Sequence, residues 1–196
     1  IDSKNSEISI LNSQLFNGDG NGIITRQSKI ELQDSYIEGS HVDVEERYPV
    51  VWSSQSNLNI KNTTVFQPQY AAAMCIVNNS YIAAENTTST SVEMSASRGV
   101  VEDVTISESL SLQDLSLLVS KKRVSINGEN SGKVDILVSG SSVINMEELQ
   151  LNREDKPHLR LKDNSHIRVK KLDVRNFNDK EIVLEVEETS SFSNIT

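Results

Sequence analysis

The sequence is poor in the residues that break or cross-link a chain. Its 196 residues include only three prolines, eight glycines and one cysteine. So few prolines and glycines argue against long disordered linkers, and a single cysteine excludes a disulfide within the chain. Only 36% of the residues are hydrophobic. That share is small for a compact globule and suits a narrow repeat core beneath a large outer surface.

Other absences narrow the classes of function. No apolar run approaches 18 residues, so no membrane insertion is expected. The net charge of −9 makes nucleic acid and anionic membranes unfavourable partners. No phosphate loop, nucleophile elbow, dinucleotide fingerprint or calcium loop is present, so no cofactor is expected.

The few metal-ligating residue types do not form a site. His41, His158 and His166 have no ligand spacing with Cys75, so no metal is expected. Cys75 follows Ala71–Met74 and precedes Ile76, and this context favours a small buried residue in a strand.

A ten-residue phrase recurs along the chain at constant phase. Counted from a serine, it has apolar or small residues at +2 and +4, Asn or Asp at +6, and Ser or Thr at +7. Copies begin at Ser6, Ser28, Ser56 and Ser80, and looser ones at Ser97, Ser142 and Ser165. A second apolar ladder runs through Val92/Met94, Leu115/Leu117, Ile136/Val138, Leu159/Leu161 and Ile182/Leu184.

These repeats predict an all-β solenoid. Apolar and polar residues alternate within each segment, which is the period of a strand, and a repeat of 20 to 30 residues indicates stacked coils. We therefore expect one domain over residues 1–196, a parallel β-helix of about eight coils of 20–28 residues. The Asn or Asp at +6 ties down a bend and stacks on its neighbours. A β-sandwich is the alternative, but it gives no reason for the constant phase.

The phrases beginning at Ser6, Ser28, Ser56 and Ser80 resemble the right-handed parallel β-helix superfamily, which includes pectate-lyase-like enzymes, phage tailspikes and autotransporter passenger domains. The resemblance implies a right-handed coil, a polysaccharide partner and an extracellular, cell-surface or virion location, although a cytoplasmic location stays open. Residues 190–196 read as the opening of a further coil without a polar cap. The chain is therefore expected to be a fragment of a longer protein.

The first candidate surface lies within the longest repeat step, between Ser28 and Ser56. Aromatic rings stack on apolar sugar faces, and aromatic residues gather in this region and in the next coil. The candidate glycan-binding residues here are His41, Tyr48, Trp52, Phe66 and Tyr70. The competing interpretation, which the sequence favours, is that Trp52 or Tyr36 packs into the core or under the loop.

The same loop offers candidates for catalysis. Glycoside hydrolysis needs two carboxylates at a defined separation, which Asp43, Glu45 and Glu46 would supply. Lyase chemistry on uronates needs a base beside a cation, and Arg47 is a candidate for it. However, the outward positions of the coils that begin at Ser28, Ser56 and Ser80 carry no ladder of carboxylates, and this argues against catalysis.

The second candidate surface is a basic stripe on two late strands. It comprises His158, Arg160 and Lys162, followed by His166, Arg168 and Lys170. A 23-residue step predicts Lys162 beside Glu185, His158 beside Glu181 and Lys170 beside Glu147, which is ordinary cross-strand pairing. Arg160 and Arg168 then remain as the unmatched candidates for binding an anionic polysaccharide.

Three functions follow from different classes. The leading one is a non-catalytic β-helix module of a larger bacterial or phage surface protein, a scaffold that also binds glycan. The alternatives are a polysaccharide lyase, hydrolase or epimerase, and a structural adhesin or self-assembly segment. Homo-oligomers or other domains of the same longer chain are the expected protein partners.

Overall fold

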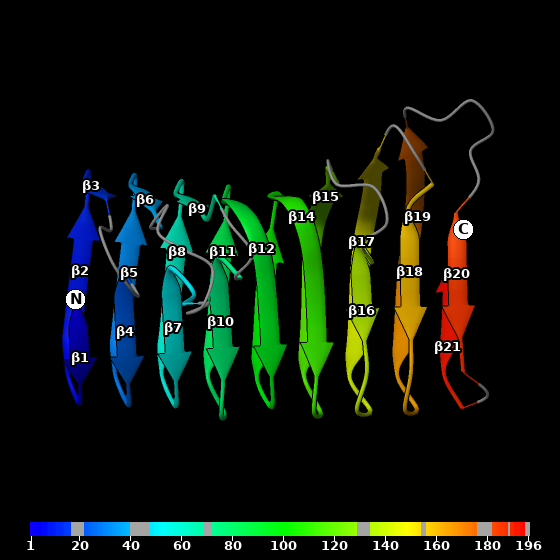
Figure 1. Cartoon of the computed structure of the whole chain (residues 1–196), viewed down its shortest axis with the longest axis horizontal. Helices are drawn as coiled ribbons and strands as arrows, with labels where there is room; N and C mark the ends of the chain where they lie inside the picture. The colour runs from blue at the N-terminus through cyan, green and yellow to red at the C-terminus, as the bar shows by residue number, and fades with distance from the viewer. Residues whose placement is uncertain are drawn as a thin grey trace.

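The chain forms a parallel β-helix, in which each coil contributes strands to three sheets (Figure 1). The structure is a computed structural model that describes residues 1–16, 22–39, 48–68, 72–128, 134–153, 156–175, 182–187 and 189–194. All strand pairings among these residues are parallel, and the sheet wraps 322° round the long axis. No helix in the described part of the chain is long and apolar enough to cross a membrane.

Sheet I contains one segment from each of nine coils. Its members are β1 (Asp2–Lys4), β4 (Ile23–Arg26), β7 (Val51–Ser54), β10 (Met74–Val77), the second halves of β12 (Thr88–Ser95) and β14 (Val104–Gln113), β16 (Ile136–Val138), β18 (His158–Leu161) and β20 (Val183–Val186).

Sheet II follows directly in each coil. Its members are β2 (Glu7–Leu11), β5 (Lys29–Gln33), β8 (Asn57–Lys61), β11 (Tyr81–Glu85), β13 (Arg98–Glu102), the first halves of β15 (Leu117–Ile126), β17 (Val143–Asn152) and β19 (His166–Arg175), and β21 (Ser191–Asn194).

Sheet III completes the coil. It contains β3 (Gln14–Phe16), β6 (Tyr36–Glu38), β9 (Thr64–Phe66), the first halves of β12 and β14, and the second halves of β15, β17 and β19. Most segments outside the described residues follow sheet III and precede sheet I in sequence. β12 and β14 instead run from sheet III into sheet I without a break.

A ladder of buried serines fixes the phase of the coils. In successive coils the backbone N–H of one serine donates to the Oγ of the next, as from Ser28 to Ser56 at 3.0 Å and from Ser116 to Ser142 at 3.0 Å. The ladder contains Ser6, Ser28, Ser56, Ser80, Ser97, Ser116 and Ser142, and it resumes from Ser165 to Ser190. Its steps include 17 and 19 residues, below the expected range.

The second predicted apolar ladder was partly wrong. Val92 is in register with Leu110, not with Leu115, and Leu110 is in register with Ile136. Leu159 is in register with Leu184 rather than Ile182. Both errors arise because the residues between sheets vary in number, so a constant step drifts out of register.

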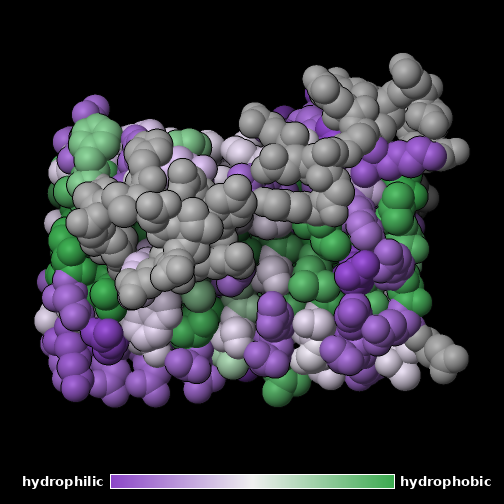
Figure 2. All heavy atoms as spheres, in the orientation of Figure 1, coloured by the Kyte–Doolittle hydropathy of each residue, from purple (hydrophilic) through white to green (hydrophobic). Residues whose placement is uncertain are grey.

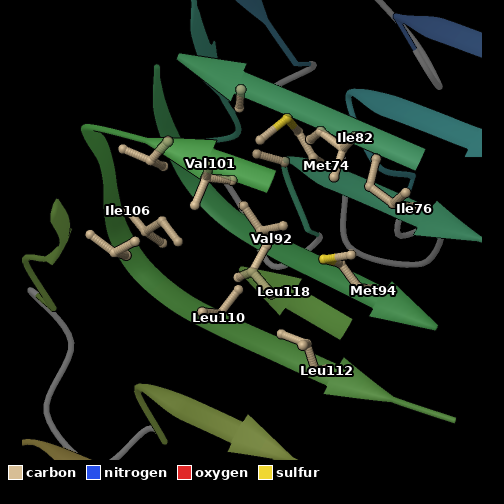
Figure 3. Close-up of a cluster of buried hydrophobic side chains, with 14 of the residues drawn as sticks. Met74, Ile76, Ile82, Val92, Met94, Val101, Ile106, Leu110, Leu112 and Leu118 are labelled. Carbon is tan, nitrogen blue, oxygen red and sulfur yellow. The ribbon is translucent and has the colours of Figure 1, made fainter. Parts of the chain in front are cut away.

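The core is a continuous column of inward Ile, Leu, Val and Met side chains. In sheet II the inward row runs through Ile30, Leu58, Ile82, Gly99 and Leu118. Figure 3 shows the middle of this column, where Met74, Ile82, Val101 and Leu118 point toward one another from neighbouring strands. Burial of this aliphatic surface is the main favourable term in the stability of the fold.

Residues of left-handed backbone conformation turn the chain at two corners. The predicted Asn/Asp positions at +6 all have φ between 47° and 50°: Asn12, Asp34, Asn62, Asn86 and Asp103. Asn and Asp tolerate this conformation better than most residues. The residue before each ladder serine from Ser6 to Ser165 is also left-handed, and there the sequence is less suitable, because Ala96 and Leu115 occupy two of these positions at φ 47° and 64°.

We expect Leu115→Asn to raise the free energy of unfolding by about 1 kcal/mol, because asparagine relieves the left-handed strain of a bulky residue. Leu115 is 75% exposed, so little packing is lost. The measurement is urea denaturation followed by circular dichroism. Leu11→Asn is the matched control, since Leu11 is 49% exposed within strand β2 and asparagine is unfavourable there. Equal destabilisation by both changes would refute the strain argument.

Candidate functional site

An open groove follows the corner between sheets II and III in the first three coils. It encloses about 460 Å³ and is lined by Asn12, Ser13, Gln14, Asp34, Ser35, Tyr36 and Asn62. Because coils stack in register, three turn residues and the strand residues after them come to lie side by side. We name this feature the corner groove.

A polar ladder forms one side of the corner groove. Asn62 Nδ2 donates to Asp34 Oδ1 at 2.8 Å, and Asn86 Nδ2 donates to Asn62 Oδ1 at 3.3 Å. Gln33 Nε2 donates to the other oxygen of Asp34 at 2.8 Å. The hydrogen bond from Asn62, followed by that from Gln33, lowers the pKa of Asp34 below 3.8. Asp34 is therefore an ionised acceptor at neutral pH, held in a fixed orientation.

Tyr36 lines the other side, and Phe16 lies next to it outside the groove. The ring of Tyr36 lies 6.0 Å from that of Phe16, with the planes tilted by 50°. Phe16 is 68% exposed, and Figure 2 shows apolar surface at the top of the first coil, over β3. The Tyr36 hydroxyl donates to Glu38 Oε2 at 2.8 Å, and burial together with this carboxylate raises the pKa of Tyr36. The phenol is therefore neutral and fixed at neutral pH.

Five of the residues predicted within the long loop, and one in the next coil, lie outside the described residues. They are His41, Asp43, Glu45, Glu46, Arg47 and Tyr70. Tyr48 and Phe66 are described, and they are 40% and 38% exposed. Gln67, which follows Phe66, donates from Nε2 to the Tyr48 carbonyl at 3.0 Å, so both aromatic residues lie at the same corner of the coil.

Trp52 and Tyr36 do not pack into the core, so that part of the favoured interpretation was wrong; residues 40–47 of the loop lie outside the described residues. Each occupies an outward strand position between inward neighbours and is only half-buried. The Trp52 ring lies on sheet I, with the Arg26 guanidinium carbon 5.3 Å from its centroid. Arg26 also pairs with Asp2 at 2.7 Å. Trp52 therefore belongs to a cation–π contact on a different sheet from Tyr36 and the corner groove.

The structure pairs three of the six stripe residues with carboxylates, because His158 and Arg160 share Glu185 and Lys170 contacts Glu147, and the predicted register was wrong for the first of the two strands. Arg160 pairs with Glu185, so Arg160 is not unmatched, and Lys162 does not occupy the predicted position beside Glu185. The reason is a step of 25 residues where 23 was expected. The predicted contact between Lys170 and Glu147 is confirmed at 2.6 Å. Arg168 is exposed on the outer face of sheet II, and Glu181 lies outside the described residues.

The described residues offer little for nucleophilic or metal chemistry. Cys75 lies at an outward position of β10, between Trp52 and Glu93 in register. Burial, followed by the charge of Glu93, raises the pKa of its thiol to about 11. The thiol is protonated at neutral pH and a poor nucleophile. Among the residues that the structure describes, no three His, Cys, Asp or Glu side chains come together as ligands.

Sequence reasoning missed Asn12 and Gln14 as candidate site residues. The sequence contained a signal for this groove, because Gln14 and Tyr36 each follow a +6 position by two residues and are therefore equivalent positions in neighbouring coils. The +6 residues have a sufficient role in the turn, so the repeat alone gives no reason to assign them a ligand. Comparison with known proteins adds no assignment: no protein-family model, no curated protein and no solved structure matches the chain.

Proposed function

We propose that this chain is a non-catalytic β-helix scaffold of a bacterial or phage surface protein and that it binds glycan in the corner groove. The observation that carries the proposal is the combination of one aromatic ring, that of Tyr36, with a fixed ladder of amides and a carboxylate. Sugars offer both features a partner, since their C–H faces stack on rings and their hydroxyls bond amides and carboxylates.

The chemistry of the groove favours a neutral or amino sugar. Asp34 is ionised, Glu38 lies at the aromatic side, and no lysine or arginine is among the lining residues. An anionic polysaccharide would meet like charge here, which disfavours binding. The rigid strands on either side hold the donors and acceptors in place, so little ordering is needed when the ligand binds.

The enzymatic alternative depends on Asp43, Glu45, Glu46 and Arg47, which lie outside the described residues. The corner groove favours recognition, with the solenoid as a rigid support.

A glycan array with neutral, amino and anionic oligosaccharides tests the proposal. We expect the unmodified chain to bind neutral or amino sugars, and Tyr36→Ala and Asp34→Asn each to weaken binding about tenfold or more. Asparagine tolerates the left-handed backbone at position 34, so this variant keeps the turn. Binding should be constant from pH 7 to pH 5, because Asp34 stays ionised throughout this range.

Tyr81→Ala is the matched control, because Tyr81 is 41% exposed on sheet II, away from the corner groove. It should leave binding unchanged. Failure of the unmodified chain to bind any glycan would overturn the proposal and favour a purely structural scaffold. Binding that is lost equally in Tyr81→Ala would place the site elsewhere.

A further inference from the structure

The outer face of sheet II has an aliphatic centre. Ala83, Val100 and Val119 follow one another in register along three successive coils. Leu117 and Tyr81 flank them, and Tyr81 is 41% exposed. The members of this row are half-buried and have a polar rim, and apolar patches with a polar rim mark interaction surfaces. We name this surface face II.

The central row of face II is symmetric in chemistry about Val100. In coil order it reads Glu31, Asn59, Ala83, Val100, Val119, Asn145 and Arg168. The residues one coil away from Val100, on either side, are aliphatic. Those two coils away carry amides. Three coils away there is an anion on one side and a cation on the other.

The neighbouring charged row repeats this arrangement over its five central positions, whereas Gln33 and Lys170 at its ends do not have opposite charge. It reads Gln33, Lys61, Glu85, Glu102, Lys121, Glu147 and Lys170, with Lys121 Nζ 3.4 Å from Glu102. The residues one coil away from Glu102 on either side, Glu85 and Lys121, have opposite charges. The residues two coils away, Lys61 and Glu147, also have opposite charges.

A two-fold axis along the strand direction through Val100 and Glu102 would therefore place complementary groups opposite each other. We propose that face II pairs with face II of a second copy of this chain, with the two solenoids running in opposite directions. Lys61 of one copy then faces Glu147 of the other, Glu31 faces Arg168, and the aliphatic centres meet. Such an interface is isologous, because the same patch serves both subunits.

Two charged residues, Glu102 and Arg98, lie on the axis and so face the same residue of the other copy. In each case the repulsion between the like charges is relieved. Glu102 is already neutralised by Lys121 and Lys122, each with its Nζ at 3.4 Å. Arg98 is exposed at the start of β13, at the margin of face II, where a long side chain extends into solvent.

The size of face II sets the strength of the pair. Seven strands about 4.8 Å apart and about five residues long span roughly 29 by 16 Å. That footprint, about 460 Å² for each copy, is at the low end of specific interfaces. A dimer with a micromolar dissociation constant is expected rather than a permanent one. The mixed charge along its rim gives the pairing its register.

Sedimentation equilibrium of the unmodified chain, from low to several hundred micromolar, tests the proposal. We expect a reversible monomer–dimer equilibrium, and Val100→Glu should weaken it at least tenfold by placing two carboxylates on the axis. Glu93→Lys, on the outer face of sheet I, is the control and should leave the equilibrium unchanged.

Charge reversal separates this arrangement from general stickiness or loss of fold. Lys61→Glu and Glu147→Lys should each weaken the dimer, and the double variant should restore it. Within one chain, the first change places a carboxylate beside Glu85 and the second an amine beside Lys170. These two contacts are four coils apart, so combining the changes relieves neither. Rescue can therefore come only from contact between copies. A monomer at all concentrations, or no rescue, would overturn the proposal; neither outcome bears on the corner groove.

Discussion

Replacing Arg153 by methionine is expected to lower the free energy of unfolding by about 3 to 5 kcal/mol. Arg153 pairs with Asp135, and the two side chains are only 2% and 1% exposed. Asp135 precedes β16 and Arg153 follows β17, so the pair joins the start of sheet I to the end of sheet III in the same coil.

The cost arises from the carboxylate that the change leaves behind. Asp135 Oδ2 accepts the His158 backbone N–H at 2.6 Å, but methionine does not replace the charged donor that Arg153 presents to Oδ1. Removing one partner of a buried ion pair is strongly destabilising. For a chain of this length the loss corresponds to a fall in Tm of roughly 6 to 20 °C, which circular dichroism will detect.

Two controls isolate the buried charge. Asp135→Asn combined with Arg153→Met should recover most of the lost stability, because the amide oxygen keeps the bond from His158 and no charge remains. Arg175→Met removes an exposed ion pair with Asp173 and should cost less than about 1 kcal/mol. If the Arg153→Met variant were no less stable than Arg175→Met, the buried pair would contribute no more to the stability of the fold than an exposed pair does.

The repeat could be predicted from the sequence because stacked coils require similar residues at equivalent positions. Inward residues such as Ile30, Leu58 and Ile82 must match from coil to coil, and so must the turn residues Asp34 and Asn62. The all-β solenoid could therefore be derived from phase alone. The serine at the start of each phrase was recognised as a marker, but its role required the structure, since the bond from one serine to the next joins residues up to 28 positions apart.

Register failed where the residues between sheets change in number. The serine ladder steps by 17 residues at Ser97 and by 26 at Ser142, so a fixed step misaligned Leu115 and Lys162. No local pattern reveals such a length change. The corner groove was missed for a different reason. Asn12 and Asp34 are explained completely by the bend, and only the neighbouring rings of Phe16 and Tyr36 make them candidates for binding.

Replacing Gly99 by valine is expected to lower the free energy of unfolding by about 1 to 3 kcal/mol through overpacking. Gly99 interrupts the inward row between Ile82 and Leu118. A Cβ atom built at this position would lie 2.8 Å from Ile82 Cγ2, 3.0 Å from Leu118 Cδ1 and 3.4 Å from Met94 Cε. Side chains from three other strands, those of Ile82, Met94 and Leu118, already occupy the volume that a larger residue would need.

The shortness of this coil is the cause of that crowding. Only 17 residues separate Ser80 from Ser97, because β12 passes from sheet III to sheet I without a loop. The void between Met74, Val92 and Leu110 is about 20 Å³, too small to take the displaced groups. Gly99→Ala is the matched control. Its single methyl group crowds Ile82, but alanine in a strand is more favourable than glycine by roughly 0.5 to 1 kcal/mol of folding free energy, which offsets this strain. Alanine should therefore be close to neutral, whereas valine should be clearly destabilising in urea titration. Equal stability of the two variants would mean that the short coil has room to expand, and that packing does not require glycine at this step of the solenoid.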